Sequence, residues 1–429
     1  MKLAAPLFLT GIIFCAPSPT PAADWPMFRG PNRDGISTET SAPLTWSQDK
    51  NIKWKTPLPM PGNSSPVVSH GRVFLTCAQD EEGTQRSLLC FDRQTGKQLW
   101  AQTVNYPTHE PTHQTNPYCA SSPGVDPDGK HVIVWHGSAG VHCYDLDGKE
   151  LWSRDLGTFR QIWGYAGSPL ILGERVILNC GPGSHSFVIA LSLADGKTLW
   201  KTDEPLGADN QLPQTKSWIG SWSTPVPAKI DGKTQLLVTQ PRRTNAYDPQ
   251  SGNILWSCAG TGDLAYTDPC VSEKLGVGAA FSGFMGPSIG FKLGGSGDVT
   301  ATNRLWRNAD KSQNPQRIGT GVVIGDQVFM ANDQQGNGPT LQCLDLLSGK
   351  QAWGEKPRGD FFWSSTTLIA NRLYATSKKG TTYVFAPDPT QFKLLATNPL
   401  NETTNSTLAP SNGEIFLRTF KHLYCIADK

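Results

Sequence analysis

The residues that most directly suggest chemistry are His109, Glu110 and His113, which have the spacing H-E-x-x-H. In zinc peptidases this spacing works because a helix carries both imidazoles on one face, with the glutamate as general base. Here Pro111 lies inside the pattern, and a helix cannot pass through it without losing a hydrogen bond. We therefore interpret the pattern as a chance match in a loop, whose three side chains are still chemically capable metal ligands.

A second group of residues suggests binding. Aromatic, polar and charged side chains gather in four short segments, residues 113–119, 160–168, 214–224 and 358–365. If these segments are loops that meet at one place, the aromatic faces supply apolar area and the charges fix a ligand's orientation. The same residues could instead plug a channel and support its walls. The candidate contacts, to which Arg317 is added, are His113, Asn116, Tyr118, Trp163, Tyr165, Lys216, Trp218, Trp222, Arg317, Asp360 and Trp363.

The elements that must position these segments are indicated by a repeat. The stretch Cys-Phe-Asp-Arg-Gln-Thr-Gly-Lys-Gln-Leu-Trp at residues 90–100 has near copies ending at Trp152, Trp200, Trp256 and Trp353. Each copy places a glycine turn between two short apolar strands, which predicts a β-hairpin. The tryptophans recur about every 50 residues, the length of four short strands in a propeller blade. The series is Trp54, Trp100, Trp152, Trp200, Trp256, Trp306 and Trp353.

We predict an all-β fold, an eight-bladed β-propeller of four-stranded antiparallel blades. Seven blades lie near residues 63–100, 118–152, 166–200, 221–256, 266–306, 319–353 and 363–395. The eighth joins residues 406–428 to residues 44–54, so that the N- and C-terminal strands pair and leave no free edge. Proline is tolerated at the first residue of a strand, so the innermost strands are expected at Ser65-Pro66, Ser122-Pro123, Ser168-Pro169, Thr224-Pro225 and Asp268-Pro269. The fifth blade has a glycine-rich stretch, and the seventh has Leu395 in place of tryptophan.

The cysteines are predicted to be free and buried. Cys90, Cys143, Cys343 and Cys425 share one position of the repeat, and the corresponding residues elsewhere are Ala190, Ala246, Ala301 and Ala386. A position that alternates cysteine with alanine requires a small buried side chain. Equivalent positions in different blades would also lie too far apart to form a disulfide.

The N-terminus has the features of an export signal. Met1 and Lys2 precede an apolar stretch to Ala16 and a segment rich in proline and alanine. We expect a signal peptide at residues 1–23, an N-terminal arm at 24–43, a propeller at 44–429, and a location in the periplasm or cell envelope. The net charge of +2 implies neither nucleic acid nor an anionic membrane, and no later segment has the length of a membrane span. We expect a monomer.

The pattern ending in tryptophan resembles the tryptophan-docking motif of the pyrroloquinoline quinone (PQQ) repeat family of eight-bladed propellers. The opening Trp-Pro-Met-Phe-Arg-Gly-Pro at residues 25–31 is similar to the start of its exported members, so the resemblance covers about residues 24–429. The family includes quinoprotein dehydrogenases, in which a Cys-Cys pair lies over PQQ near a catalytic aspartate and calcium ligands. This sequence has no Cys-Cys, and its available carboxylates lie in no matching motif: Asp263, Asp268, Asp298 and Asp360.

The resemblance also extends to a non-enzymatic member of the family, the outer-membrane assembly lipoprotein BamB. Two functions follow from these observations. The first is a non-catalytic, BamB-like exported scaffold that binds a protein, a peptide or a small ligand at the loop-lined face of the channel, with no catalytic residues and no cofactor. The alternative is an enzyme. It would be either a PQQ- and calcium-dependent oxidoreductase or a metal-assisted hydrolase that uses His109, Glu110 and His113.

Overall fold

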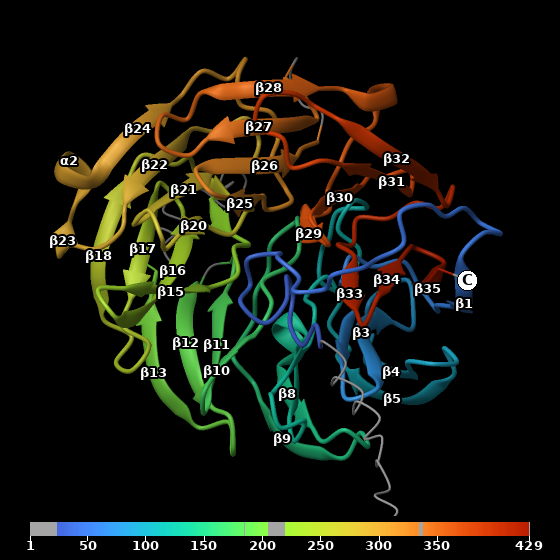
Figure 1. The fold of residues 1–429 in the computed structure, drawn as a ribbon. Helices are drawn as coiled ribbons and strands as arrows, with labels where there is room; N and C mark the ends of the chain where they lie inside the picture. The colour runs from blue at the N-terminus through green and yellow to red at the C-terminus, as the bar shows by residue number, and fades with distance from the viewer. Residues whose placement is uncertain (1–23, 184, 205–218, 334–337, 429) are drawn as a thin grey trace, which may run out of the picture.

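A computed structural model describes residues 24–183, 185–204, 219–333 and 338–428. The sheets are arranged in a ring around one axis (Figure 1), and the chain passes through them in order. The predicted signal peptide and the candidates Lys216 and Trp218 lie outside the described residues. Within the described part of the chain, no helix is long and apolar enough to cross a membrane.

The first four blades are antiparallel sheets whose strands follow chain order. They consist of β2 (Val67–Ser69), β3 (Arg72–Ala78), β4 (Gln85–Asp92) and β5 (Gln98–Asn105); β6 (Gly124–Val125), β7 (Val132–Trp135), β8 (Val141–Tyr144) and β9 (Glu150–Arg154); β10 (Leu170–Leu172), β11 (Arg175–Cys180), β12 (Phe187–Ser192) and β13 (Thr198–Asp203); and β15 (Val226–Ile230), β16 (Lys233–Gln240), β17 (Arg243–Tyr247) and β18 (Ile254–Ala259). A 3-10 turn, η1 (Gly137–Ala139), connects β7 to β8.

The last four blades repeat this arrangement. They consist of β20 (Cys270–Ser272), β21 (Val277–Phe281), β22 (Ser288–Lys292) and β24 (Arg304–Asn308); β25 (Val322–Ile324), β26 (Gln327–Ala331), β27 (Leu341–Asp345) and β28 (Gln351–Glu355); β29 (Thr367–Ile369), β30 (Arg372–Thr376), β31 (Thr381–Phe385) and β32 (Leu394–Pro399); and β33 (Ala409–Ser411), β34 (Glu414–Arg418), β35 (His422–Ile426) and β1 (Ile52–Pro57). The remaining elements are β14 (Gly220–Ser221), β19 (Leu264–Ala265), β23 (Gly297–Asp298), α2 (Thr300–Asn303) and η2 (Pro357–Gly359).

The ring closes as the sequence predicted. The N-terminal strand β1 pairs antiparallel with the C-terminal strand β35, and Trp54 lies opposite Cys425. The prediction of eight four-stranded antiparallel blades is therefore confirmed, and β23 adds a short parallel strand to the outer edge of blade 4.

The repeat joins each blade to the next. The indole N–H of Trp152, in blade 2, donates to Leu193 O of blade 3 at 2.8 Å. A Cβ added at Gly196, in the turn of that same repeat, would lie 2.5 Å from the Trp152 ring. The glycine is therefore required both for its positive φ of 69° and for this close approach. Most other docking tryptophans also donate to a carbonyl of the following blade, namely Trp54 to Arg93, Trp100 to Leu146, Trp200 to Pro249, Trp306 to Leu346 and Trp353 to Asp388.

Two positions in the predicted small-residue series were wrong. The residue opposite the tryptophan of blade 5 is Gly290, not Ala301, because the insertion that contains β23 and α2 separates the third strand from the fourth. In blade 7 the equivalent pair is Val384 and Ala396, so neither Ala386 nor Leu395 has the expected place.

The cysteine prediction is confirmed. All nine cysteines of the described chain are free and buried. Burial raises the pKa of the Cys90 thiol to about 12 and that of Cys343 to about 12, because the apolar surroundings disfavour the thiolate. These cysteines therefore serve as small apolar core residues.

The segment before β1 crosses one end of the channel. Trp25 exchanges two backbone hydrogen bonds with Val68 of blade 1. The Arg29 guanidinium donates to Thr320 O at 3.0 Å and Gly321 O at 2.7 Å in blade 6. Arg33 donates to Pro169 O of blade 3 at 3.0 Å. Residues 24–39 of the predicted N-terminal arm (24–43) thus link blades on opposite sides of the axis, and this part is called the arm below.

Candidate functional site

A closed ring of hydrogen bonds surrounds the channel. The Ser65 N–H donates to Ser122 Oγ of the next blade at 2.8 Å, and the Ser122 N–H donates to Ser168 Oγ at 3.1 Å. Each of these residues lies two positions before the innermost strand of its blade. The order of donor and acceptor continues through Thr224, Asp268, Thr320, Ser365 and Thr407, and returns to Ser65. We call these eight residues the hydroxyl ring, although one member is an aspartate.

The hydroxyl ring forms the wall of a cavity of about 420 Å³ on the channel axis. Along each inner strand, the loop before the ring residue leads to one mouth. At the opposite end, two backbone carbonyls accept hydrogen bonds from the arm. They belong to the ring residue Thr320 and to Pro169, which follows a ring residue. Phe28 of the arm also lines the cavity. The arm therefore closes one end, and the cavity is lined by the inter-blade loops at the other.

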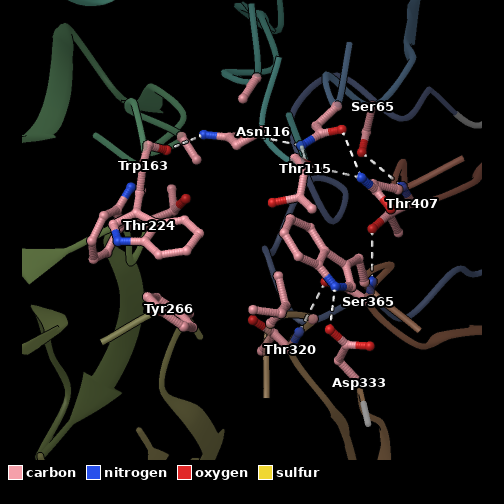
Figure 2. Close-up of a pocket in the computed structure, with 18 of the residues that line it drawn as sticks. Ser65, Thr115, Asn116, Trp163, Thr224, Tyr266, Thr320, Asp333, Ser365 and Thr407 are labelled. Carbon is pink, nitrogen blue, oxygen red and sulfur yellow. Dashed lines mark hydrogen bonds between the residues drawn. The ribbon is translucent and has the colours of Figure 1, made fainter. Parts of the chain in front are cut away.

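Aromatic side chains surround the mouth. Figure 2 shows Trp163 and Tyr266 on one side of the cavity, with Thr320, Asp333 and Ser365 on the other. The His113 and Trp163 rings have centroids 4.4 Å apart. Trp163 and Tyr266 are both partly exposed. The mouth therefore presents apolar faces to whatever enters.

Asparagine amides form a polar side of the same mouth. Asn116 Nδ2 donates to Trp163 O at 2.7 Å, and its Oδ1 accepts from Asn63 Nδ2 at 2.8 Å. Asn405 Nδ2 donates to Asn63 Oδ1 at 3.1 Å, which extends the chain of amides. The buried Asn405 Oδ1 has no hydrogen-bond partner among the described residues.

The cavity wall contains one carboxylate paired with an ammonium group, and a second carboxylate on the hydroxyl ring. Trp363 donates from its indole to Asp333 Oδ2 at 2.7 Å, while Lys378 lies over the Trp363 ring and 3.8 Å from the same carboxylate. On the ring, burial raises the pKa of the Asp268 carboxyl, an effect that the nearby Arg33 and Arg29 only partly oppose. Asp333 and Lys378 thus balance each other.

The structure brings together five of the candidate residues. His113, Asn116, Trp163, Trp222 and Trp363 all line the cavity. They come from the loops that lead into four different blades, as expected for convergence around a propeller axis. Their role in binding stays a prediction.

Four other candidates have side chains elsewhere. Tyr118 is buried and donates to Glu110 O, and Tyr165 packs against Trp135 with centroids 5.2 Å apart. Asp360 accepts from Tyr383 and pairs with Lys379 at 3.0 Å. Since successive side chains of an extended segment point to opposite sides, Arg317 faces away from the cavity that its neighbour Gln316 lines. None of these four lines the cavity.

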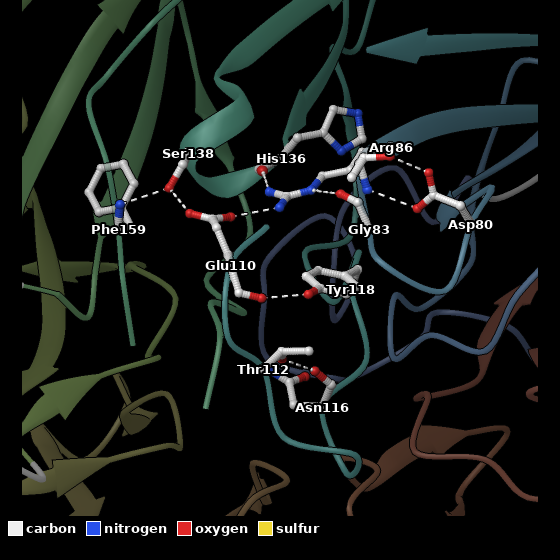
Figure 3. Close-up of polar contacts among 11 residues, drawn as sticks. Asp80, Gly83, Arg86, Glu110, Thr112, Asn116, Tyr118, His136, Ser138 and Phe159 are labelled. Carbon is white, nitrogen blue, oxygen red and sulfur yellow. Dashed lines mark hydrogen bonds and ion pairs between the residues drawn. The ribbon is translucent and has the colours of Figure 1, made fainter. Parts of the chain in front are cut away.

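The H-E-x-x-H segment has no helix, as the sequence predicted. Figure 3 shows Glu110 pointing toward Arg86 and Ser138. Glu110 Oε2 pairs with the buried Arg86 at 2.6 Å, and Oε1 accepts from Ser138. His109 is exposed. Across the described residues, no three His, Cys, Asp or Glu side chains are grouped as metal ligands, and the Glu110 carboxylate supports the loop.

Sequence reasoning missed most of the cavity wall. The Ser-Pro, Thr-Pro and Asp-Pro pairs were interpreted only as strand starts, although their equal offset from each inner strand places them on one ring. The arm residue Phe28 gave no signal, because its position depends on contacts with blades distant in sequence. The other lining residues that were not predicted include Asn63, Thr115, Tyr266, Phe284, Gln316, Asp333, Phe361, Lys378 and Asn405.

Comparison with known proteins gives one family. The family model described as outer membrane protein assembly factor BamB matches residues 84–355 and 184–429. None of the curated proteins compared with the chain matches it.

Several solved structures share the architecture. BamB from Moraxella catarrhalis is 14% identical, with a TM-score of 0.59 over 87% of this chain and 99% of that chain. A quinohemoprotein alcohol dehydrogenase from Pseudomonas putida HK5 is 12% identical, with a TM-score of 0.52 over 94% and 80% of the two chains. The C-terminal WD40 domain of Sif2 is 11% identical, with a TM-score of 0.56 over 89% and 99%. At these identities the similarity concerns the fold alone.

Proposed function

The chain belongs to the PQQ-repeat family whose model is described as outer membrane protein assembly factor BamB, and from this premise we propose that it is a non-catalytic binding scaffold of the cell envelope. Its occupant is a short segment of a partner protein held at the channel mouth. The predicted export signal supports this location, and the balanced net charge gives no reason to invoke nucleic acid.

One observation carries the proposal. The mouth combines aromatic faces with asparagine amides from several blades, above a cavity whose far end is closed by the arm. A volume of about 420 Å³ accommodates a few side chains or a small ligand, but not a folded domain. Aromatic faces suit apolar side chains. The Oδ1 atoms of Asn63 and Asn116 each accept one hydrogen bond from the described residues, so each keeps a lone pair that can accept from a peptide N–H.

PQQ-dependent oxidation is the second candidate, because a quinohemoprotein dehydrogenase shares the fold. PQQ is a planar tricarboxylate, so its site must supply positive charge or a cation. Among the described residues, the acidic and basic side chains that line this cavity are those of His113, Asp268, Asp333 and Lys378, and Lys378 lies within 3.8 Å of Asp333. This set of side chains does not fit a trianion, so we assign no step to PQQ.

A peptide selection tests the scaffold proposal. A dodecapeptide phage library is selected on the wild-type protein, and the enriched peptides are titrated by calorimetry against Trp163→Ala/Trp363→Ala. We expect affinity to fall at least about tenfold, since truncation of buried aromatic anchors costs roughly 2 kcal/mol or more. Leu199→Ala, on the exposed outer strand β13, is the matched control and should bind like wild type.

Three results would count against the proposal. Peptides that bind the double variant as tightly as wild type would place the site elsewhere. A library that yields no binding peptide would remove the peptide as occupant. Saturable binding of PQQ with calcium chloride, lost in the same double variant, would favour the oxidoreductase instead.

A further inference from the structure

A second cavity of about 260 Å³ lies between blades 5 and 6. It is separate from the central cavity, and Arg317 is its sole charged lining residue among those described. Its walls are formed by Phe281 and Trp306 from blade 5 and by Leu344 and Gln351 from blade 6, together with Ser288, Asn308, Ser312, Gln313, Gly338, Pro339 and Gly349.

The Arg317 guanidinium is buried without a carboxylate partner. The side chain is 2% exposed, and no ion pair of the described residues includes it. Nη1 donates to the neutral Asn314 Oδ1 at 2.8 Å, and Nε has no hydrogen-bond partner there. Residues 334–337, which directly precede the lining residue Gly338 in the sequence, include no acidic residue.

Other buried arginines show how this protein usually compensates such a charge. Arg86 pairs with Glu110 at 2.6 Å, and Arg93 pairs with Glu414 at 2.9 Å. Arg418 has no carboxylate but donates to Thr76 O at 2.8 Å and to other groups of the same region. Within the described chain, the Arg33 side chain makes a single hydrogen bond, to Pro169 O, but Asp268 lies near enough to favour its charged form. Arg317 has Asn314 as its one hydrogen-bond partner among the described residues and no carboxylate nearby, and a buried cation with so few partners is costly.

The electrostatics of this cavity have one sign. Burial lowers the pKa of Arg317 to about 9, because no nearby carboxylate offsets the loss of hydration. The guanidinium rests on the Phe281 ring, with its carbon 5.0 Å from the centroid. The neutral Gln351 also lines the cavity, and its amide can donate to an anion. The Ser288 hydroxyl already donates to Asn314 Oδ1 at 2.9 Å.

We propose that the cavity between blades 5 and 6 binds an oxyanion on Arg317, as a free phosphate or as the carboxylate of a small organic molecule. A guanidinium fork matches the oxygens of both groups. The volume exceeds that needed for phosphate alone, and the Trp306 and Phe281 rings could pack against the apolar part of an organic anion.

Thermal melts of the full protein test the proposal with three probes, sodium phosphate, sodium benzoate and neutral benzamide, against sodium chloride at equal ionic strength. We expect phosphate or benzoate to raise the Tm by about 2 °C or more at saturation, while benzamide gives no rise. A rise with phosphate alone identifies a free inorganic anion, and a rise with benzoate identifies an organic carboxylate.

Two variants separate binding from a structural role. In Arg317→Met the anion-dependent rise should disappear, while the Tm in chloride stays equal to or above that of wild type, because an uncompensated buried charge has been removed. Arg307→Met, whose guanidinium is exposed on β24, should keep the rise. The proposal is overturned if no anion raises the Tm of wild type, if benzamide acts like benzoate, or if Arg317→Met keeps the response or melts well below wild type in chloride.

Discussion

The most strongly compensated charge among the residues of the predicted metal pattern is Glu110. Its two oxygens are both used, one by Arg86 and one by Ser138. Arg86 in turn donates to Gly83 O at 2.9 Å and His136 O at 2.6 Å, so a single ion pair holds three stretches of chain together. A pattern that formally indicates a catalytic base is thus explained by the stability of the loop that carries His113 to the cavity.

Replacing Glu110 by glutamine should therefore destabilise the protein. We expect Glu110→Gln to lower the free energy of unfolding by about 3–5 kcal/mol, because it leaves the buried Arg86 without its counter-charge. Urea denaturation measures this change. His109→Ala, at an exposed position one residue earlier, should alter stability by less than about 0.5 kcal/mol. A stable Glu110→Gln protein that lost a zinc-dependent hydrolase activity would support the metal-site alternative instead.

At the scale of secondary-structure elements, the repeat was predictable because it is local in sequence. The strand, the glycine turn and the tryptophan strand follow one another within eleven residues, and each copy forms the outer hairpin of one blade. The predicted partners of the outer strand were wrong in blades 5 and 7, because the spacing between the last two strands there differs from that of the other copies. The contact between a tryptophan and the next blade's glycine was not visible in the sequence. Each copy of the repeat contains both a glycine and a tryptophan, but the glycine contacts the tryptophan of the preceding copy.

Glycine substitutions in blade 4 test this contact between blades. A Cβ at Gly252 would lie 2.4 Å from the Trp200 ring of blade 3, whereas Gly232 has nearly the same φ and open space around it. Gly232→Ala should cost about 1–2 kcal/mol for the left-handed conformation alone. Gly252→Ala should cost about 1–3 kcal/mol more, the usual range for overpacking.

Chemical denaturation of the two variants, repeated with Trp200→Ala, separates the two contributions. Trp200→Ala alone should cost about 3–5 kcal/mol. In that background the ring no longer occupies the space, so the extra cost at Gly252 should disappear. Equal costs for Gly252→Ala and Gly232→Ala in the original protein would show that the contact contributes nothing.

At the scale of the whole molecule, the channel is organised by the hydroxyl ring and the arm. Both depend on residues that lie far apart in the chain, such as Thr407 with Ser65, or Arg29 with Thr320. The sequence predicted the loops that meet at the mouth, since any propeller brings them together. It could not predict the depth of the cavity, because that depth depends on the position of the arm, and the sequence of the arm has no strand periodicity.

The arm should be held in place chiefly by Arg29. Its buried guanidinium donates to five carbonyls, those of Arg33, Asp34, Thr320, Gly321 and Thr366. In Arg29→Met these buried acceptors lose their donor, so we expect the free energy of unfolding to fall by about 2–4 kcal/mol.

Arg33 is only 1% exposed and should resist trypsin in the wild-type protein. In the variant, cleavage there should accelerate and release a product that begins at Asp34, identified by N-terminal sequencing. Arg160→Met, at an exposed position, should leave both stability and cleavage unchanged. If Arg29→Met were as stable and as resistant at Arg33 as wild type, the arm would be anchored by its backbone contacts with blades 1, 2 and 7, and the closed end of the cavity would not depend on this side chain.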